Sequence, residues 1–193
     1  LLANRPWDRK QKGFLLFLIP AMLWSLSASF FRSDFFMEDK LLLVKVVLCS
    51  SIWVFLQFYY FLRSFHQPST RQKPFAYVLL VSTIALAALD YIPRDISVTA
   101  SGINVDYGNW LILIGLLLLI LGSKELYLLL QRRKSSTNPA EKNQITYLFF
   151  GIVVLVVFGL SSFVPSGGEY PLPHIGNLAN ACILTYAVAA HRL

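Results

Sequence analysis

Long apolar runs are the feature that most constrains what this chain can fold into. A helix needs about 20 mostly apolar residues to cross the hydrocarbon core of a membrane. Only 14% of the residues are charged, whereas a soluble domain usually carries about a quarter. The sequence therefore predicts one all-α domain over residues 1–193, an integral membrane bundle. Its six transmembrane helices are expected at about residues 14–31, 41–62, 75–92, 110–130, 145–164 and 172–190.

The basic residues in the loops predict how these helices are oriented. Twelve Lys and Arg residues lie on one side of the predicted bundle, and only Arg32, Lys40 and Arg94 lie on the other. Because cytoplasmic loops collect Lys and Arg, both ends of this chain are predicted to be cytoplasmic, in the inner (plasma) membrane. Residues 1–3 lack a Met and look like the tail of an earlier helix. The six helices are thus expected to be the last six of a seven-helix module.

The net charge of +7 does not indicate nucleic-acid binding, because the basic residues lie in short loops and not on one polar face. Cys49 and Cys182 fall inside apolar runs and are interpreted as buried hydrophobic residues. His66 and His191 are on the predicted cytoplasmic side and His174 is on the outer side, which disfavours a shared metal ion or a haem. No catalytic residues, no metal site and no cofactor are predicted.

Polar side chains inside or beside the apolar runs are the candidate contacts for a ligand. Asn177 and Asn180 share one face of the last helix, since they are three residues apart. They form either hydrogen bonds between helices or a ligand contact. Asp90 lies either in an outward-facing pocket or at a hydrated helix end. The full set of ligand-binding candidates is Trp24, Asp90, His174, Asn177 and Asn180.

Other charges in the apolar runs have simpler interpretations. Lys45 lies about one turn inside its helix and is expected to extend towards Asp39 or the lipid headgroups. Lys124 and Glu125 are expected to form a solvated or interfacial pair near the inner end of the fourth helix. In the longest outer connection, residues 96–105 alternate apolar and polar side chains, which predicts a short strand pair or an interfacial cap.

The order of several motifs resembles the N-terminal seven-transmembrane sensor region of bacterial and archaeal histidine kinases and related signalling proteins. The resemblance implies a membrane fold whose last helix leads into cytoplasmic modules of a two-component system, with a histidine kinase as the full-length parent. The first of the seven helices and any output module are not in this chain. The motifs are Pro-Ala-Met-Leu-Trp-Ser-Leu at 20–26, Asn-Pro-Ala-Glu-Lys-Asn-Gln at 138–144, Gly151, and the segments 170–180, 185–188 and 191–193.

Two functions stay open at this point. The first is a sensor and anchor module, which is expected to form a homodimer. The second is a small accessory subunit of a larger membrane complex, respiratory or photosynthetic, which the short chain ends favour. Such a subunit is expected to present a lipid-facing stripe formed by Phe55, Phe58, Tyr59 and Leu62. A transporter or membrane enzyme is disfavoured, because the predicted membrane midplane holds few polar groups.

Overall fold

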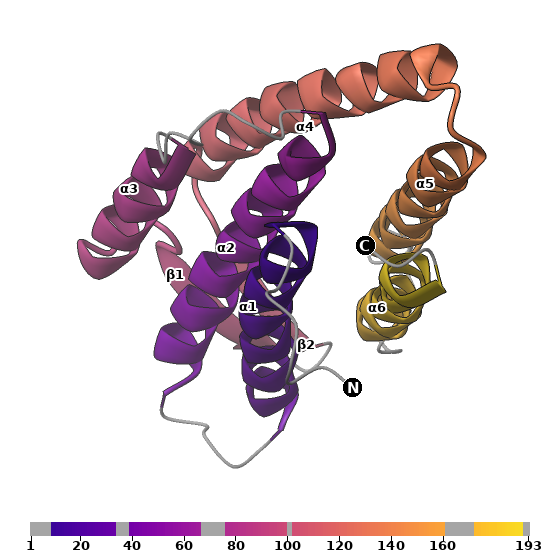
Figure 1. Cartoon of the computed structure of the whole chain (residues 1–193). Coiled ribbons are helices and arrows are strands. Elements are labelled where there is room, and N and C mark those ends of the chain that lie inside the picture. Colours follow the sequence, from indigo (N-terminus) through magenta and orange to yellow (C-terminus); the bar gives the residue numbers. More distant parts are fainter. Residues whose placement is uncertain (1–8, 34–38, 67–75, 100–101, 161–171, 191–193) are drawn as a thin grey trace. The chain divides into compact units, whose positions relative to one another are not determined.

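The six predicted apolar segments are helical. The computed structural model describes residues 9–33, 39–66, 76–99, 102–160 and 172–190. In chain order its elements are α1 (Arg9–Arg32), α2 (Lys40–His66), α3 (Tyr77–Ala88), β1 (Asp95–Thr99), β2 (Gly102–Asp106), α4 (Trp110–Ser135), α5 (Pro139–Leu160) and α6 (Leu172–Ala190) (Figure 1). Residue 75 and residues 161–164 of the predicted segments lie outside the described residues.

Within the described part of the chain, three helices are long and apolar enough to cross a membrane. They cover Gln11–Phe31, Lys40–Ser64 and Trp110–Ser135, in α1, α2 and α4. Large apolar side chains on these helices, such as Met22 and Ile112, point away from the protein. An outward apolar surface on long helices is what contact with lipid requires. The chain therefore has the helices of a membrane protein.

Helix α3 ends earlier than the predicted boundary at residue 92. Asp90 adopts a left-handed conformation with a φ of 60°. The amide of Asp90 donates to the carbonyl of Ala87, and the amide of Tyr91 donates to the carbonyl of Leu86. These two bonds close a Schellman-type cap, in which a left-handed residue stops the helix. Pro93 follows and cannot continue a helix, so the apolar run extends beyond the helix that it contains.

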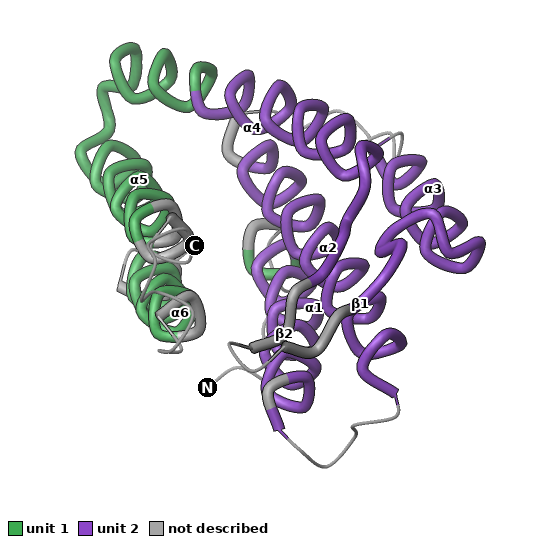
Figure 2. The backbone as a smooth tube through the Cα atoms, turned by 180° about the vertical axis from the view of Figure 1, so that it is seen from behind, with its two compact units in different colours: residues 1–12, 127–193 green, residues 13–126 purple. Residues whose placement is uncertain are grey.

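The chain divides into two compact units (Figure 2). In the unit of residues 13–126, one face of α2 provides most of the core. Leu48, Ile52 and Leu56 repeat every four residues and are buried together with Ile92 and with Ile114 of α4. This spacing places the three α2 side chains on one face of the helix. Helices α2, α3 and α4 therefore share one apolar cluster.

Aromatic rings hold α1 against α2, on the part of α2 that was predicted to face lipid. The rings of Phe17 and Phe58 have centroids 5.4 Å apart. Of the predicted lipid-facing stripe only Phe55 is exposed, whereas Tyr59 and Leu62 are buried. The prediction is wrong for these two residues, because the second half of α2 packs on more than one side. The stripe therefore gives no support to an accessory subunit.

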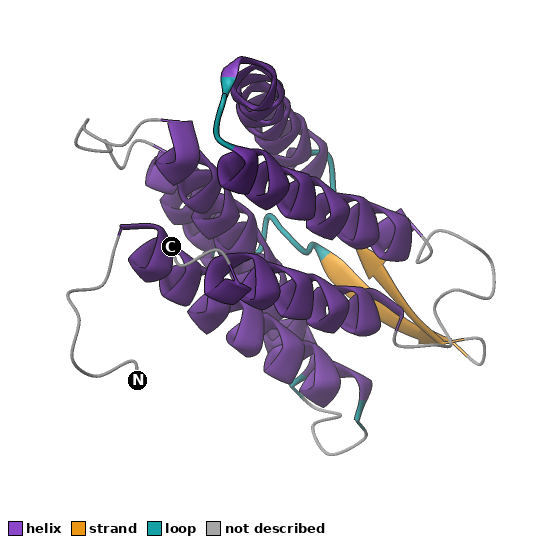
Figure 3. Ribbon diagram, turned by 45° about the vertical axis from the view of Figure 1, so that its right-hand side comes forward, coloured by secondary structure: helices purple, strands orange, loops and turns teal. Residues whose placement is uncertain are grey.

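The segment between α3 and α4 forms the predicted strand pair. Strands β1 and β2 are antiparallel (Figure 3). Ile96 stands opposite Val105, and an apolar pair directly across two strands stabilises a hairpin. The amide of Arg94 extends the pairing by donating to the carbonyl of Asp106 over 2.8 Å. The alternating pattern thus predicted the strands correctly.

Helix α5 begins six residues before the predicted start at residue 145. Asn138 precedes the helix and its side-chain oxygen accepts a hydrogen bond from the amide of Ala140 over 3.0 Å. Pro139 occupies the first helical position, where its missing N–H costs nothing. The carboxylate of Glu141 accepts from Arg132 over 2.5 Å and from Ser136 over 2.7 Å. Polar capping groups therefore extend α5 beyond its apolar run.

Candidate functional site

The predicted ligand-binding residues do not all fall in one unit of the structure. Trp24 is half-buried in α1 and Asp90 is exposed directly after α3, both within residues 13–126. Asn177 and Asn180 are buried in α6, which belongs to the other unit. His174 is in the first turn of α6, and its side chain lies outside the described residues. The structure therefore brings together Asn177 and Asn180, as their spacing predicted.

Asn180 of α6 lies directly against α5. Its side chain is 0% exposed, and it packs directly on Gly151 of α5. A Cβ atom added at Gly151 would lie 3.4 Å from Cγ of Asn180 and would collide with its Oδ1. The same Cβ would be 3.7 Å from Leu184. Gly151 is therefore needed for two helices to approach this closely, as small residues are in membrane helix pairs.

Within the described part of the chain, the carboxamide of Asn180 is buried without hydrogen bonds. Neither its Oδ1 nor its Nδ2 has a hydrogen-bond partner among the residues that the structure describes. A buried polar group left in this state costs about 1–3 kcal/mol. Asn177 differs, because it does have an interaction partner. Of the two predicted asparagines, Asn180 thus holds a donor and an acceptor that a ligand or a second helix packing would satisfy.

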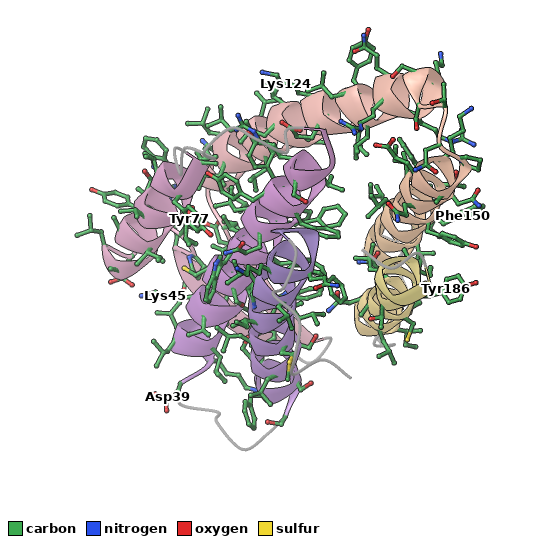
Figure 4. All side chains as sticks on the ribbon, in the orientation of Figure 1. Asp39, Lys45, Tyr77, Lys124, Phe150 and Tyr186 are labelled. Atoms are coloured by element: carbon green, nitrogen blue, oxygen red, sulfur yellow. The ribbon has the colours of Figure 1, made fainter. Side chains whose placement is uncertain are left out.

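An ion pair joins α2 to the end of α3. Lys45 lies on α2 (Figure 4), and its Nζ is 2.5 Å from Asp90 Oδ1, with side chains 19% and 65% exposed. Lys45 therefore pairs with Asp90 and not with Asp39, whereas its predicted extension towards the lipid headgroups stays a prediction. The left-handed cap after α3 turns Asp90 towards α2, which pairs two charges 45 residues apart in the chain. Because Asp90 is largely exposed, the pair adds at most about 1 kcal/mol in water.

A polar cluster near the start of α3 was not predicted. The side-chain amide of Gln57 donates to the hydroxyl of Tyr77. The ring of Tyr77 stacks on Tyr60 with centroids 5.4 Å apart, and the hydroxyl of Tyr60 accepts from the amide of Ala76 over 3.1 Å. These contacts link the middle of α2 to the first turn of α3 on one side of the apolar cluster. They support the packing of these two helices.

Glu125 is the second polar residue whose placement differs from the prediction. Its side chain is only 2% exposed, whereas Lys124 is exposed, so the Glu125 carboxylate is not solvated. The charges of Arg63 on α2 and of the neighbouring Lys124 both act on this carboxylate. Glu125 continues the line of Ile114, Leu118 and Leu121, at spacings of four, three and four residues. That spacing puts all four on one face of α4, which is the sequence signal for its burial.

The remaining His, Cys, Asp and Glu side chains do not form a metal site in the described residues. No group of three His, Cys, Asp or Glu side chains is placed to hold a metal ion there. Cys49 is half-buried, but Cys182 is exposed, so the prediction of burial is wrong for Cys182. The two cysteines belong to different units. The α5–α6 contact at Asn180 and the Lys45–Asp90 pair are therefore the two candidate sites.

Comparisons with known proteins add no identification. No protein family, no curated protein and no solved structure matches this chain. The resemblance to a seven-transmembrane sensor region accordingly stays a prediction. The apolar helices and the two candidate sites are therefore the features that bear on function.

Proposed function

We propose that this chain is a membrane-embedded sensor and anchor module of a signal-transduction protein. Six helices cross the inner membrane, and both ends of the chain are cytoplasmic. Helices α1, α2 and α4 support this proposal by their length and apolar composition. Helix α6, with 19 residues, is about 28 Å long and also matches the hydrocarbon core. The basic residues gathered on one side support the orientation.

Helix α3 fits this proposal through the Lys45–Asp90 pair. With 12 residues, α3 is about 18 Å long, which is less than the hydrocarbon thickness. Its C-terminal end therefore stops below the membrane surface, and Asp90 lies at the depth of Lys45 in α2. A lone charge at that depth is costly, whereas a pair of opposite charges is tolerated. The pair thus allows a short helix to take part in the bundle.

The buried carboxamide of Asn180 is the observation that carries the sensing role. It lies in the last helix, which is the helix expected to lead to an output module. A ligand changes the balance between two packings only if it binds one of them more tightly. The donor and the acceptor of this carboxamide have no partner among the described residues, so a ligand or a second packing of α5 and α6 could bind them. Signal detection is therefore assigned to α5 and α6.

Labelling from the two sides of the membrane tests the topology. With Cys49 and Cys182 replaced by Ala, a cysteine introduced at Ser136 should react only with a reagent on the cytoplasmic side. A cysteine introduced at Ser166 should react only from the outer side, because one helix separates the two positions in the proposed topology. Intact cells and inverted vesicles, each treated with a membrane-impermeant maleimide, give the comparison. Reaction of both positions from the same side would contradict the six-helix arrangement.

An accessory subunit of a larger membrane complex is the alternative function. The exposed face of α4, with Ile112, Leu116 and Leu119, is the observation that favours it. Lipid covers such a face in a sensor, and other membrane chains cover it in a subunit.

Mass measurement after purification in mild detergent distinguishes the two functions. The sensor is expected as a homodimer, because signalling modules of the kind that it resembles act in pairs. Recovery in fixed ratio with unrelated membrane polypeptides would overturn the sensor proposal. A homodimer free of other chains would overturn the subunit alternative.

A further inference from the structure

A shallow apolar groove lies where α4 ends and α5 begins. Its volume is about 230 Å³. Apolar side chains make up most of its lining, and two polar residues, Arg133 and Thr146, lie among them. The other lining residues are Leu130, Phe149, Phe150 and Val153.

The polar residues of the groove are arranged to bind an anion. Arg133 donates from Nε to the hydroxyl of Thr146 over 3.1 Å, which holds the guanidinium beside the groove. The neighbouring carboxylate, Glu141, accepts from Arg132 and from Ser136. A guanidinium presents paired N–H donors that match the oxygens of a phosphate.

The apolar residues beside Arg133 favour a ligand in which the anionic group is attached to an apolar chain. Leu130 is the last apolar residue of α4 before the basic residues Arg132, Arg133 and Lys134. Phe150, which Figure 4 labels on α5, and Val153 continue the groove along this helix, and both are largely exposed. A soluble anion would use the guanidinium but would leave this apolar wall uncovered. An acyl chain covers it, and basic pockets at the cytoplasmic ends of membrane helices are suited to anionic headgroups.

We propose that this groove binds one anionic phospholipid, with its phosphate on Arg133 and an acyl chain along Phe150 and Val153. This lipid site requires that α4 and α5 cross the membrane, which is part of the proposed function. It does not depend on signal detection by the chain. Binding at this position would tie the α4–α5 turn to the cytoplasmic leaflet. Failure of the lipid site leaves the topology labelling at Ser136 unaffected, so the two proposals fail separately.

Native mass spectrometry of the full chain with added phosphatidylglycerol or phosphatidylcholine tests the site. Phosphatidylglycerol is expected to bind at least about 5-fold more tightly, and Arg133→Gln should remove about that factor. Val153→Trp should also weaken binding, because the larger ring occupies the groove. Lys134→Gln and Leu178→Trp are matched controls, because Lys134 lies in the same last turn of α4 and Leu178 is exposed on α6, both outside the groove lining. Both controls should change the affinity less than the groove variants do.

Three outcomes would overturn the proposal. Equal losses of affinity from Arg133→Gln and Lys134→Gln would show a diffuse attraction to the basic end of α4. Unchanged binding in Val153→Trp would show that no acyl chain lies in the groove. Competition by glycerol phosphate at the same concentration as the lipid would show a site for soluble phosphate. Thermal melting of each variant confirms that the fold is retained.

Discussion

Gly151→Val is expected to lower the free energy of unfolding by about 1–3 kcal/mol, the usual cost of overpacking a close contact. The new side chain would meet Asn180, which is fully buried and has no free space into which to turn. Leu184 lies against the same position and limits movement on the other side. Helices α5 and α6 would have to separate to admit the added atoms. Thermal melting in detergent measures the loss.

A matched substitution and a second-site change show whether the loss comes from this contact. Gly115 of α4 is also a helical glycine, but a Cβ added there meets nothing within 4 Å. Gly115→Val should therefore leave the melting temperature nearly unchanged. Asn180→Ala opens space opposite Gly151, so Gly151→Val should cost less in that background, as coupled neighbours do in a double-mutant cycle. Equal losses of stability from Gly151→Val and Gly115→Val would contradict a close contact between Gly151 and Asn180. A loss from Gly151→Val that stays the same in the Asn180→Ala background would also contradict it.

The features that the sequence predicted well depend on residues close together in the chain. Six apolar runs of suitable length became six helices, and the bounds of α6 are those predicted. Alternation between residues 96 and 105 was enough to predict strands β1 and β2. The i, i+3 spacing of Asn177 and Asn180 predicted their common buried face correctly. Each of these patterns is a periodicity that a short window of sequence contains in full.

Helix ends were predicted less well, because backbone capping decides them and hydropathy does not. The apolar run of α3 continues through Leu89 and Ile92, but the left-handed conformation of Asp90 stops the helix. The apolar run of α5 begins at Ile145, but the cap formed by Asn138 starts the helix at Pro139. The Asn138–Pro139 pair is a recognisable start signal. The left-handed Asp90 carries no such signal, since few non-glycine residues adopt that conformation.

Contacts between distant residues were the part that the sequence did not predict. Lys45 and Asp90 were both conspicuous, yet nothing local shows that the turn after α3 brings them together. Gln57 and Tyr77 were missed because each looks like a single polar group in an apolar helix. These partners become known only when the register between two helices is known. Burial of a polar residue can be predicted from periodicity, whereas its partner requires the fold.

Asn180→Leu and Asn177→Leu are expected to change stability in opposite directions. The two residues share one face of α6, and both are buried. Asn180→Leu should raise the free energy of unfolding by about 1–3 kcal/mol, because it removes a buried carboxamide without partners and keeps the volume. Asn177 does have an interaction partner, so Asn177→Leu should lower the free energy of unfolding by about 0.6–2 kcal/mol. Thermal melting of both variants in the same detergent gives the comparison.

Whether Asn180→Leu raises or lowers the melting temperature also tests the proposed role of Asn180 in sensing. If the carboxamide only joined helices in the packing seen here, its loss would lower the melting temperature as the loss of Asn177 does. A lowered melting temperature would show that the Asn180 carboxamide has hydrogen-bond partners. It would therefore remove the basis for assigning signal detection to the α5–α6 contact. A raised melting temperature means that the native sequence keeps a polar group at a cost in stability. Proteins keep such groups chiefly at sites where a ligand or a second conformation uses them.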